Sequence, residues 1–503
     1  VAVRSSYFAP TFDGLTVTGA PGSGVHASGG GSMQGHMWNL SGNTEYGLRI
    51  DTAEVIVDGV LLDGNGFAGA LIEDGRSVEL SNLTASNNGQ SGILPGQQAG
   101  LHYLRSNDVE SNSGDVRCLH CEVRGNAGHA LFIEDSVDLW IEDLLVEDVA
   151  SGEVPISVDN SNLNFGQLGG RFRFMNVTVW ANATDGSGTP LPAIDVQSAD
   201  GAFEGLNLHG VHAGVVWNAD VPGQRVSYLH DTTLDDAGCL DLSDQKLLRI
   251  NRLDITGCTG ALTLSNSDVN ITATDLTALA INGASIDLSD ASTLHLSNSP
   301  VSPFTSINID ATSMIEEAWP VEVWVRNLVG NGVPFASVDL SFTAVAPARA
   351  LATDVNGHMV LDDAIARVID TNGPSAYGNL NVTCTYDGVS TSVEVLFDDA
   401  TTVYCALPLS NQPPFVNWTS PEDETTFPSN GEVLFDASTS WDMDDDALTY
   451  SWASSLEGDL FMGCTGSSAP GERTPQEGAP FTVNGNDTFG CSLGDGVHII
   501  TLQ

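Results

Sequence analysis

Hydrophobic and polar residues alternate in short runs over residues 1–312, and the runs recur with a period of about 22 residues. Alternation with a period of two is typical of a β-strand that has one buried face and one face in water. Each run follows a glycine, and the glycines that keep the period are Gly24, Gly47, Gly69, Gly92, Gly214, Gly238 and Gly260. The pattern predicts one short strand in every repeat.

A second alternating strand recurs in the same period, as in Val78-Glu-Leu-Ser-Asn-Leu-Thr84 and Phe172-Arg-Phe-Met-Asn-Val-Thr178. Asn-Gly and Asp-Gly clusters, which favour turns, separate the runs. A repeat of this size without a helix cannot bury its apolar face alone, whereas stacked repeats form a continuous core. We therefore expect an all-β protein in which residues 1–312 form a parallel β-helix of about 22-residue coils, roughly 60 Å long.

Over these residues the chain resembles the right-handed β-helix proteins of the pectate-lyase-like superfamily. The resemblance lies in the period and supports the fold far better than it supports any activity. Three short strings that we associate with polygalacturonases, Asn-Thr-Asp, Gly-His-Gly and Arg-x-Lys, are missing, and Gly210-Val-His-Ala-Gly214 is only similar to the second.

The 22-residue period ends near Ser313, and two β-sandwich domains are expected to follow. Residues 313–410 contain several alternating strands and a turn, Thr353-Asp-Val-Asn-Gly357. They resemble the Ig-like modules related to carboxypeptidase regulatory domains, which usually act as spacers. Residues 411–503 begin with Asn411-Gln-Pro-Pro414 and contain Leu448-Thr-Tyr-Ser-Trp452. They resemble a PKD domain that stops before its last strand is complete, so we expect a fragment of a longer surface protein.

The chain has 65 acidic and 16 basic residues, a formal net charge of −49, and Lys246 as its one lysine. Nucleic acid and anionic membrane surfaces are poor partners for such a field. Two explanations of the charge stay open: adaptation to high salt, which points to a halophilic archaeon or a marine bacterium, and a surface that collects divalent cations. No stretch approaches the roughly 18 apolar residues of a membrane helix.

Eight cysteines fall in neighbouring pairs along the chain, which predicts disulfides and an extracellular or cell-surface location. The pairs are Cys239 with Cys258, Cys384 with Cys405, Cys464 with Cys491, and Cys118 with Cys121. In the repeat alignment Cys118 and Cys121 take the core positions of Leu80 and Leu83, which favours buried stacking or a local bridge over a metal site.

Eight Asn-x-Ser/Thr sequences are candidate glycosylation sites. Asn82 and Asn176 occupy the same coil position, where an asparagine ladder between coils competes with glycosylation. The better candidates lie in loop-like contexts. These are Asn182, Asn417 and Asn486, and the remaining ones are Asn39, Asn270 and Asn381.

Two kinds of acidic site are candidates for chemistry. Asp442, Asp444 and Asp446 alternate and are candidate calcium ligands, with a solvated turn as the alternative. Polysaccharide-cleaving β-helix enzymes use clustered carboxylates on the outer face. The candidate catalytic pairs are Glu142 with Asp143, Glu147 with Asp148, and Asp235 with Asp236 near Arg252.

We expect a non-enzymatic extracellular surface protein: an adhesin, sheath or filament subunit that presents a rigid β rod and is stabilised by disulfides and calcium. Its partners would be other copies of itself or extracellular polysaccharide. The alternative is a polysaccharide-binding or polysaccharide-cleaving β-helix protein, a lyase or a glycosidase. A groove with aromatic side chains beside paired carboxylates would favour it, and the tryptophans that bear on it are Trp140, Trp180 and Trp217.

Overall fold

The computed structural model describes residues 10–75, 77–105, 116–136, 139–150, 152–160, 170–220, 226–235, 240–256, 261–272, 285–298, 306–343, 349–409, 415–417, 426, 432–435, 439–440, 452–455, 458–459, 481–484 and 500–502. Strands dominate these residues, and their one helix is the short α1 (Pro95–Gln98). The chain divides into two compact units, residues 1–320 with 362–376 and residues 321–361 with 377–503.

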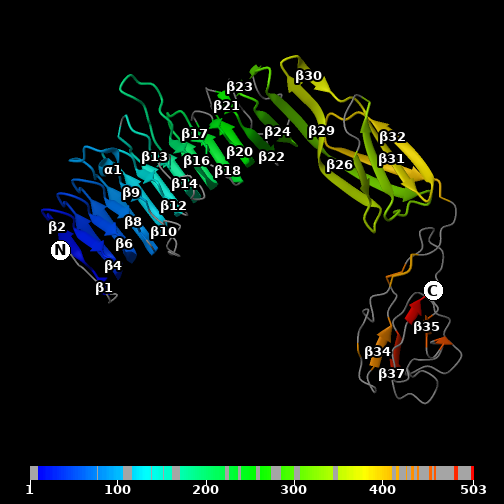
Figure 1. Ribbon diagram of the computed structural model, residues 1–503, viewed down its shortest axis with the longest axis horizontal. Coiled ribbons are helices and arrows are strands. Elements are labelled where there is room, and N and C mark those ends of the chain that lie inside the picture. Colours follow the sequence, from blue (N-terminus) through cyan, green and yellow to red (C-terminus); the bar gives the residue numbers. More distant parts are fainter. Residues whose placement is uncertain are drawn as a thin grey trace. The chain divides into compact units, whose positions relative to one another are not determined.

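The first unit is a parallel β-helix, in which each coil adds one short and one long strand to two stacked sheets (Figure 1). The short strands pair in parallel from coil to coil. They are β3 (Val25–Ser28), β5 (Leu48–Asp51), β7 (Ala70–Glu73), β9 (Leu101–Leu104), β11 (Leu131–Glu134), β13 (Ile156–Asp159), β15 (Ile194–Gln197), β17 (Val215–Asn218), β19 (Leu240–Ser243), β21 (Ala261–Ser265), β23 (Ser285–Ser289) and β25 (Ser306–Ile309).

The other sheet of this unit contains mostly longer strands, which also pair in parallel with their neighbours in the adjacent coils. These strands are β1 (Thr11–Asp13), β2 (Thr16–Thr18), β4 (Ser32–Ser41), β6 (Glu54–Asp63), β8 (Ser77–Ser86), β10 (Val116–Arg124), β12 (Leu139–Glu147), β14 (Gly170–Trp180), β16 (Ala199–His209), β18 (Ser227–Asp235), β20 (Leu248–Thr256), β22 (Asp268–Thr272), β24 (Thr293–Ser297) and β26 (Met314–Asn327). The predicted parallel β-helix is therefore confirmed.

One predicted strand start is wrong. Gly92 does not open a short strand, because α1 follows it and the strand of that coil, β9, begins at Leu101. Gly100 takes the periodic position, since its carbonyl accepts a hydrogen bond from Ala70 N, just as Gly69 O accepts one from Leu48 N. An insertion between the coils shifts the glycine period at this point.

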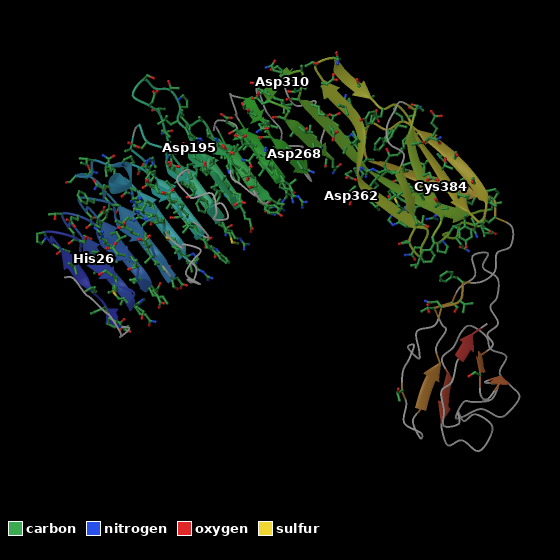
Figure 2. The ribbon with its side chains drawn as sticks, viewed as in Figure 1. His26, Asp195, Asp268, Asp310, Asp362 and Cys384 are labelled. Carbon is green, nitrogen blue, oxygen red and sulfur yellow. A yellow bond between two sulfur atoms is a disulfide. The ribbon has the colours of Figure 1, made fainter. Side chains whose placement is uncertain are left out.

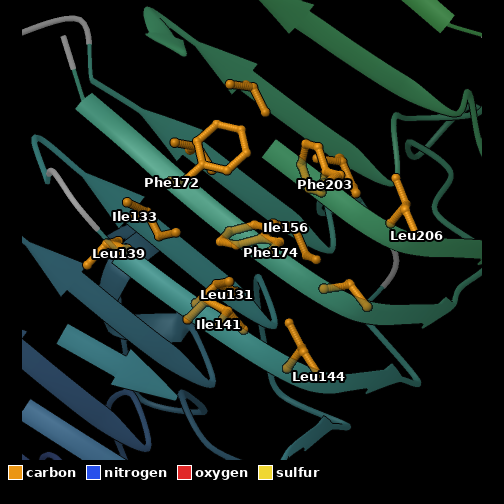
Figure 3. Packing of buried hydrophobic residues seen from close by; sticks show 14 of the residues in the cluster. Leu131, Ile133, Leu139, Ile141, Leu144, Ile156, Phe172, Phe174, Phe203 and Leu206 are labelled. Carbon is orange, nitrogen blue, oxygen red and sulfur yellow. The ribbon is translucent and has the colours of Figure 1, made fainter. Parts of the chain in front are cut away.

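The core lies between the two sheets and contains the alternate side chains of both strand types. In the short strands the first and third residues are buried, as in β5 and β13. Larger aromatic side chains fill the middle coils, where Phe172, Phe174 and Phe203 lie 5.0 to 5.2 Å apart by ring centroids (Figure 3). Trp217 is also fully buried there, and its Nε1 donates to Ala199 O at 2.9 Å.

Each long strand from β4 to β20 bends at one residue whose backbone is left-handed. These residues occupy one column of the sheet, and their φ angles lie between 48° and 74°. Glycine, asparagine and aspartate tolerate this conformation best. The column consists of Met37, Gly59, Asn82, His120, Asp143, Asn176, Gly205, Asp231 and Arg252.

The expected coil position of Asn82 and Asn176 is thus correct, but the two side chains form no asparagine ladder. Asn82 Nδ2 donates to Asp58 Oδ1 at 2.6 Å, and Asn176 Nδ2 donates to Asp143 Oδ1 at 2.9 Å. The partner is a carboxylate of the previous coil in both cases, because side chains of this column are exposed and an acidic acceptor can remain hydrated there.

A buried asparagine ladder does exist, in the turn that follows the long strands. Its members are Asn43, Asn65, Asn88 and Asn126, none of them more than 4% exposed. The Oδ1 atom of each of the last three accepts hydrogen bonds from the backbone N and the Nδ2 of the preceding member, at 2.9 to 3.0 Å. The ladder satisfies backbone groups that the turn would otherwise leave unpaired in the interior.

Serines form the corresponding ladder in the later coils, in the turn after the short strands. The backbone N of Gln245 donates to Ser267 Oγ, that of Ser267 to Ser292 Oγ, and that of Ser292 to Ser313 Oγ, all at 3.0 to 3.1 Å. All four residues are buried. Serine hydroxyl groups thus accept the backbone hydrogen bonds in the turn after the short strands, as asparagine side chains do in the turn after the long strands.

The cysteine pair of the β-helix lies in the core, in the register expected from the repeat. Cys118 pairs with Leu80, and Cys121 pairs with Leu83. The two cysteines are buried and joined by a disulfide across the left-handed residue His120. A local disulfide thus takes the place of the two leucine side chains that fill these core positions in the preceding coil.

The second unit contains the antiparallel strands β27 (Ser337–Phe342), β28 (Arg349–Ala352), β31 (Leu380–Tyr386) and β32 (Val389–Val395) in one sheet, ordered β28-β27-β31-β32. The Cys384–Cys405 disulfide joins β31 to β33 (Thr401–Leu407). In the predicted turn, Asp354 Oδ1 accepts from the backbone N of Asn356 and of His358. The Ig-like assignment of residues 313–410 remains a prediction.

The other strands are β29 (His358–Asp370), β30 (Gly373–Ala376), β34 (Glu432–Phe435), β35 (Trp452–Ser454), β36 (Gly458–Asp459), β37 (Phe481–Asn484) and β38 (Ile500–Leu502). The hairpin of β29 and β30 contributes to the β-helix unit, where Arg367 pairs with the buried Glu317 and Ile369 joins the main core. The PKD-like assignment of residues 411–503 remains a prediction, as do the bounds of the three domains.

Replacing Asn65 with alanine is expected to lower the free energy of unfolding of the β-helix by on the order of 3 kcal/mol. The substitution removes the buried acceptor of the backbone N and the Nδ2 of Asn43, and it removes one of the two donors to Asn88 Oδ1. Urea denaturation followed by circular dichroism measures the loss. Thr84→Ala, on the outer side of the next coil, is the control. An equal loss in both variants would contradict a stabilising role of the asparagine ladder.

Candidate functional site

The outer face of the short sheet carries one cluster of histidine, phenylalanine and carboxylate side chains, which we call the imidazole–carboxylate cluster. It extends over β9, β11, β13 and β15, where the residues that alternate with the core positions point outward. Its members are His102, His129, Phe132, Glu134, Glu153, Asp159 and Asp195.

His102 on β9 and Glu134 on β11 form a close contact between two members of the cluster. The Nε2 atom of His102 lies 2.7 Å from Glu134 Oε2, and the His102 side chain is only 9% exposed. Phe132 packs beside it, with ring centroids 5.3 Å apart. The Nδ1 atom of His102 is buried and has no hydrogen-bond partner in the described part of the chain.

His129 lies just before β11 and stacks on the other side of Phe132, with ring centroids 4.8 Å apart and planes 10° apart. Its Nδ1 donates to the Val154 carbonyl at 2.6 Å, while its Nε2 lies 3.6 Å from Glu153 Oε2. Burial lowers the pKa of His129, although Val154, Glu153 and Asp195 each act in the opposite direction. The neutral ring with its proton on Nδ1 is therefore the favoured form at neutral pH.

Asp195 is the carboxyl group whose environment suits a general acid (Figure 2). Burial raises its pKa, and the nearby Asp159 carboxylate raises it further, whereas a 2.6 Å hydrogen bond from Gln197 Nε2 and the electrostatic interaction with His129 lower it. A carboxylic acid with a raised pKa beside a second carboxylate is the pairing that hydrolases of sugars use.

The two histidines of the cluster are nevertheless covered. Gly96 of α1 lies over His102 so closely that an added Cβ would come within 2.2 Å of the imidazole ring. Phe132 and Leu104 also pack against a small apolar cluster around Tyr46 and Leu71 on the same face. The geometry thus assigns the histidines to packing between the loops and the sheet, and only the carboxylates remain partly open to solvent.

The structure does not bring the predicted catalytic pair Glu142 and Asp143 together as an acid and a base. Both lie on β12, but Asp143 is the left-handed residue of its strand. The Asp143 carboxylate contacts His120 Nδ1 at 2.7 Å and accepts from Asn176, so it links three neighbouring coils.

The other predicted pairs lie at the ends of long strands. Glu147 ends β12, and Asp148 follows it with a left-handed backbone. Asp235 ends β18, but its side chain and all of Asp236 lie outside the described residues. Arg252 pairs with Asp231 and lies 3.0 Å from His230 Nε2. These contacts give no convergent acid and base among the described side chains.

The three tryptophans differ in their surroundings. Trp217 is a core residue. Trp140 on β12 lies between two guanidinium groups, those of Arg117 at 4.9 Å and Arg173 at 5.0 Å from the ring centroid. Trp180 at the end of β14 is 51% exposed and stacks on a histidine of the next coil. Only Trp180 offers an accessible aromatic surface.

The predicted calcium ligands Asp442, Asp444 and Asp446 lie outside the described residues, as do Cys239, Cys258, Cys464, Cys491 and Asn486. In the part of the chain that the structure describes, no group of three or more histidine, cysteine, aspartate or glutamate side chains is arranged to hold a metal ion. The calcium assignment therefore stays a prediction.

Sequence reasoning missed the imidazole–carboxylate cluster. Leu101-His-Tyr-Leu104 and Leu131-Phe-Ile-Glu134 have the alternation of short strands, so their second residues could have been placed outward. Their separation by 30 positions, instead of the usual 22, concealed that His102 and Phe132 are register neighbours.

His212, in the segment that is similar to Gly-His-Gly, is buried, and its Nδ1 accepts a hydrogen bond from Gly214 N at 3.0 Å. Burial lowers its pKa to about 4, and the neighbouring His209 acts in the same direction. In the unfolded chain the His212 imidazole binds a proton when the pH falls below its ordinary pKa of about 6.5. In the folded chain it binds that proton only when the pH falls to about 4. The stability that His212 contributes is therefore lost as the pH falls from about 6.5 to 4.

We expect His212→Asn to remove on the order of 3 kcal/mol of the stability loss between pH 7 and pH 4, because asparagine keeps an acceptor for Gly214 but does not titrate. Urea denaturation at the two pH values measures the difference. Exposed His36→Asn is the control, and equal pH dependence of His212→Asn and the parent chain would contradict the assignment.

Comparison with known proteins supports the fold. A family model described as a right-handed beta helix region matches residues 2–165. A search of curated proteins finds no match to the chain. No helix among the described residues has the length and apolar character needed to cross a membrane. The chain is an all-β protein with a parallel β-helix, and its first third matches the right-handed β-helix model.

Proposed function

We propose that this protein is a non-catalytic extracellular surface protein that presents its β-helix as a rigid scaffold for contacts along its length. The observation that carries the proposal is the pairing of outward-facing polar side chains. Among the described residues many of them pair between neighbouring coils, where they stabilise the stack.

The coil-to-coil contacts run along both sheets. On the short sheet they include His26–Asp51 at 2.6 Å and Arg49–Glu73 at 3.4 Å. On the long sheet they include Arg173–Glu204 at 3.1 Å. Further pairs of the same kind are Ser86–Asp63, Asn87–Asp63, Asn266–Asp244 and Asn308–Asp287. Such contacts are individually weak at an exposed surface, but a regular network of them opposes slippage between coils.

Location outside the cell is supported by the covalent bridges. Cys118–Cys121 and Cys384–Cys405 are disulfides, and disulfides persist in oxidising compartments. The acidic surface, with a net charge of −49, suits a protein that stays hydrated at high salt. We therefore retain the adhesin, sheath or filament subunit as the form of this function.

A scaffold of this kind would act through many weak contacts. Repeated side chains at the coil spacing of about 4.8 Å place equivalent groups along one line. A polymer or a second copy that lies along this line meets several groups at once, and the effective concentration makes the sum strong. Extracellular polysaccharide and other copies of the chain are the partners that fit.

One observation favours a second function, the cleavage of polysaccharide. Asp195 has a raised pKa beside Asp159 on the outer face of neighbouring short strands. The pair would serve as acid and base if a sugar chain reached it. We rank this second, because the two histidines of the cluster are covered by α1 and Phe132.

The test is incubation of the purified chain with neutral and acidic polysaccharides, at high salt with calcium. We expect the polymers to stay intact, with retention of the protein on some of them. Newly formed chain ends are the measured quantity, by reducing-sugar assay and by absorbance of unsaturated uronates.

Asp195→Asn and Asp287→Asn form the matched pair, since both residues are outward-facing aspartates of short strands. New chain ends that disappear in Asp195→Asn and persist in Asp287→Asn would make the protein an enzyme and refute the scaffold function. Asp235→Ala with Asp236→Ala tests the other predicted pair in the same assay.

A further inference from the structure

The end of β14 combines an exposed aromatic ring with a glycosylation sequence. Trp180 is 51% exposed, and Asn182-Ala-Thr184 follows it. We propose that Asn182 carries an N-linked glycan whose first sugar packs on the indole of Trp180. The proposal rests on the extracellular location proposed above.

Among the described residues, one stacked ring contacts the indole of Trp180. His209, at the end of β16, stacks on it with ring centroids 4.0 Å and planes 14° apart. Trp180 is the exposed residue among the tryptophan side chains that the structure describes. Half of a large aromatic surface left in water is costly, and it suits a ligand that presents an apolar C–H face, as a pyranose ring does.

Asn182 is on the same side of the chain as Trp180. Trp180 and Asn182 are exposed and the intervening Ala181 is buried, so the two side chains point outward together. Residues two apart are at most about 7 Å from each other along the backbone. A sugar attached to the Asn182 amide therefore lies within reach of the indole ring.

The amide of Asn182 is also oriented for the modification. Its Oδ1 accepts a hydrogen bond from Val211 N at 3.0 Å, which fixes the direction of the side chain. In the described part of the chain no group accepts a hydrogen bond from its Nδ2, the atom that would carry the glycan.

The other exposed candidates use this atom. The Nδ2 atoms of Asn82 and Asn176 donate to carboxylates of the preceding coil, and that of Asn417 donates to Thr439 Oγ1 at 3.1 Å. Asn39 and Asn381 are half-buried within strands. A glycan at Asn82 or Asn176 would remove a contact between coils, whereas a glycan at Asn182 removes no hydrogen bond of Nδ2 to a described residue.

The experiment uses the full chain secreted from a eukaryotic host that attaches N-linked glycans. Glycopeptide mass spectrometry is expected to find Asn182 occupied in the parent chain and unoccupied in Thr184→Ala. Thr178→Ala, which removes the sequence at Asn176, is the matched control and leaves the glycan mass unchanged. Asn182→Gln replaces Thr184→Ala if the latter does not fold.

Packing of the sugar on the Trp180 indole is measured by hydroxyl-radical oxidation of the protein. Mass spectrometry quantifies the oxidation of each residue. We expect Trp180 to be oxidised several-fold faster in Thr184→Ala than in the parent chain. Tyr404, which is 61% exposed in the second unit, should react equally in both. An unoccupied Asn182, or equal oxidation of Trp180 in the two proteins, would overturn the proposal.

A free polysaccharide is the competing occupant of Trp180. If Asn182 is unoccupied and a neutral polysaccharide retains the parent chain but not Trp180→Ala, the ring belongs to an external sugar and the proposal is wrong. Cleavage of that polysaccharide would instead refute the scaffold function. The two proposals therefore fail on different readouts, glycan occupancy and new chain ends.

Discussion

The whole β-helix depends on the vertical register between coils. Each inner strand of the stack pairs with a strand of the coil before and a strand of the coil after it. The residues of one column can therefore differ in kind only if they keep the same backbone conformation. The column at the bend of the long strands makes this plain. Nine residues of six different kinds share a left-handed φ there, from Met37 to Arg252. The cost for the non-glycine residues is of order 1–2 kcal/mol each, and it is offset by the hydrogen bonds of two flanking strand segments per coil.

Register also decides where polar groups can be buried. The turn after each long strand is buried, and it leaves the backbone N–H of the equivalent residue in every coil in need of an acceptor. One side chain from the next coil can provide that acceptor. Asn65 does so for Asn43, and Asn88 does so for Asn65. The separation of 38 residues between Asn88 and Asn126, against 22 or 23 for the other steps, shows that an insertion leaves this interaction intact. The asparagine ladder therefore keeps the register between coils although the loops differ in length.

The sequence predicted the parallel coils and much of their register, because alternation and period report burial directly. The core positions of Cys118 and Cys121 and the shared position of Asn82 and Asn176 follow from this alone. The asparagine ladder was not predicted, although Asn43, Asn65 and Asn88 keep the period. An asparagine in an Asn-Gly or Asn-Thr turn looks the same in the sequence whether its side chain is in water or in the core.

The candidate site was harder to predict for a different reason. The period gives the contacts between coils of standard length, but the imidazole–carboxylate cluster joins coils separated by inserted loops, as His102 and Phe132 show. Loops can grow there because they add residues outside the hydrogen-bonded frame. The side chains that the frame does not use are therefore the ones available to a partner. Several acidic groups of the described residues pair between coils, as Asp63 and Asp143 do. The exposed indole of Trp180, just before one such loop, is the clearest side chain left available for a partner.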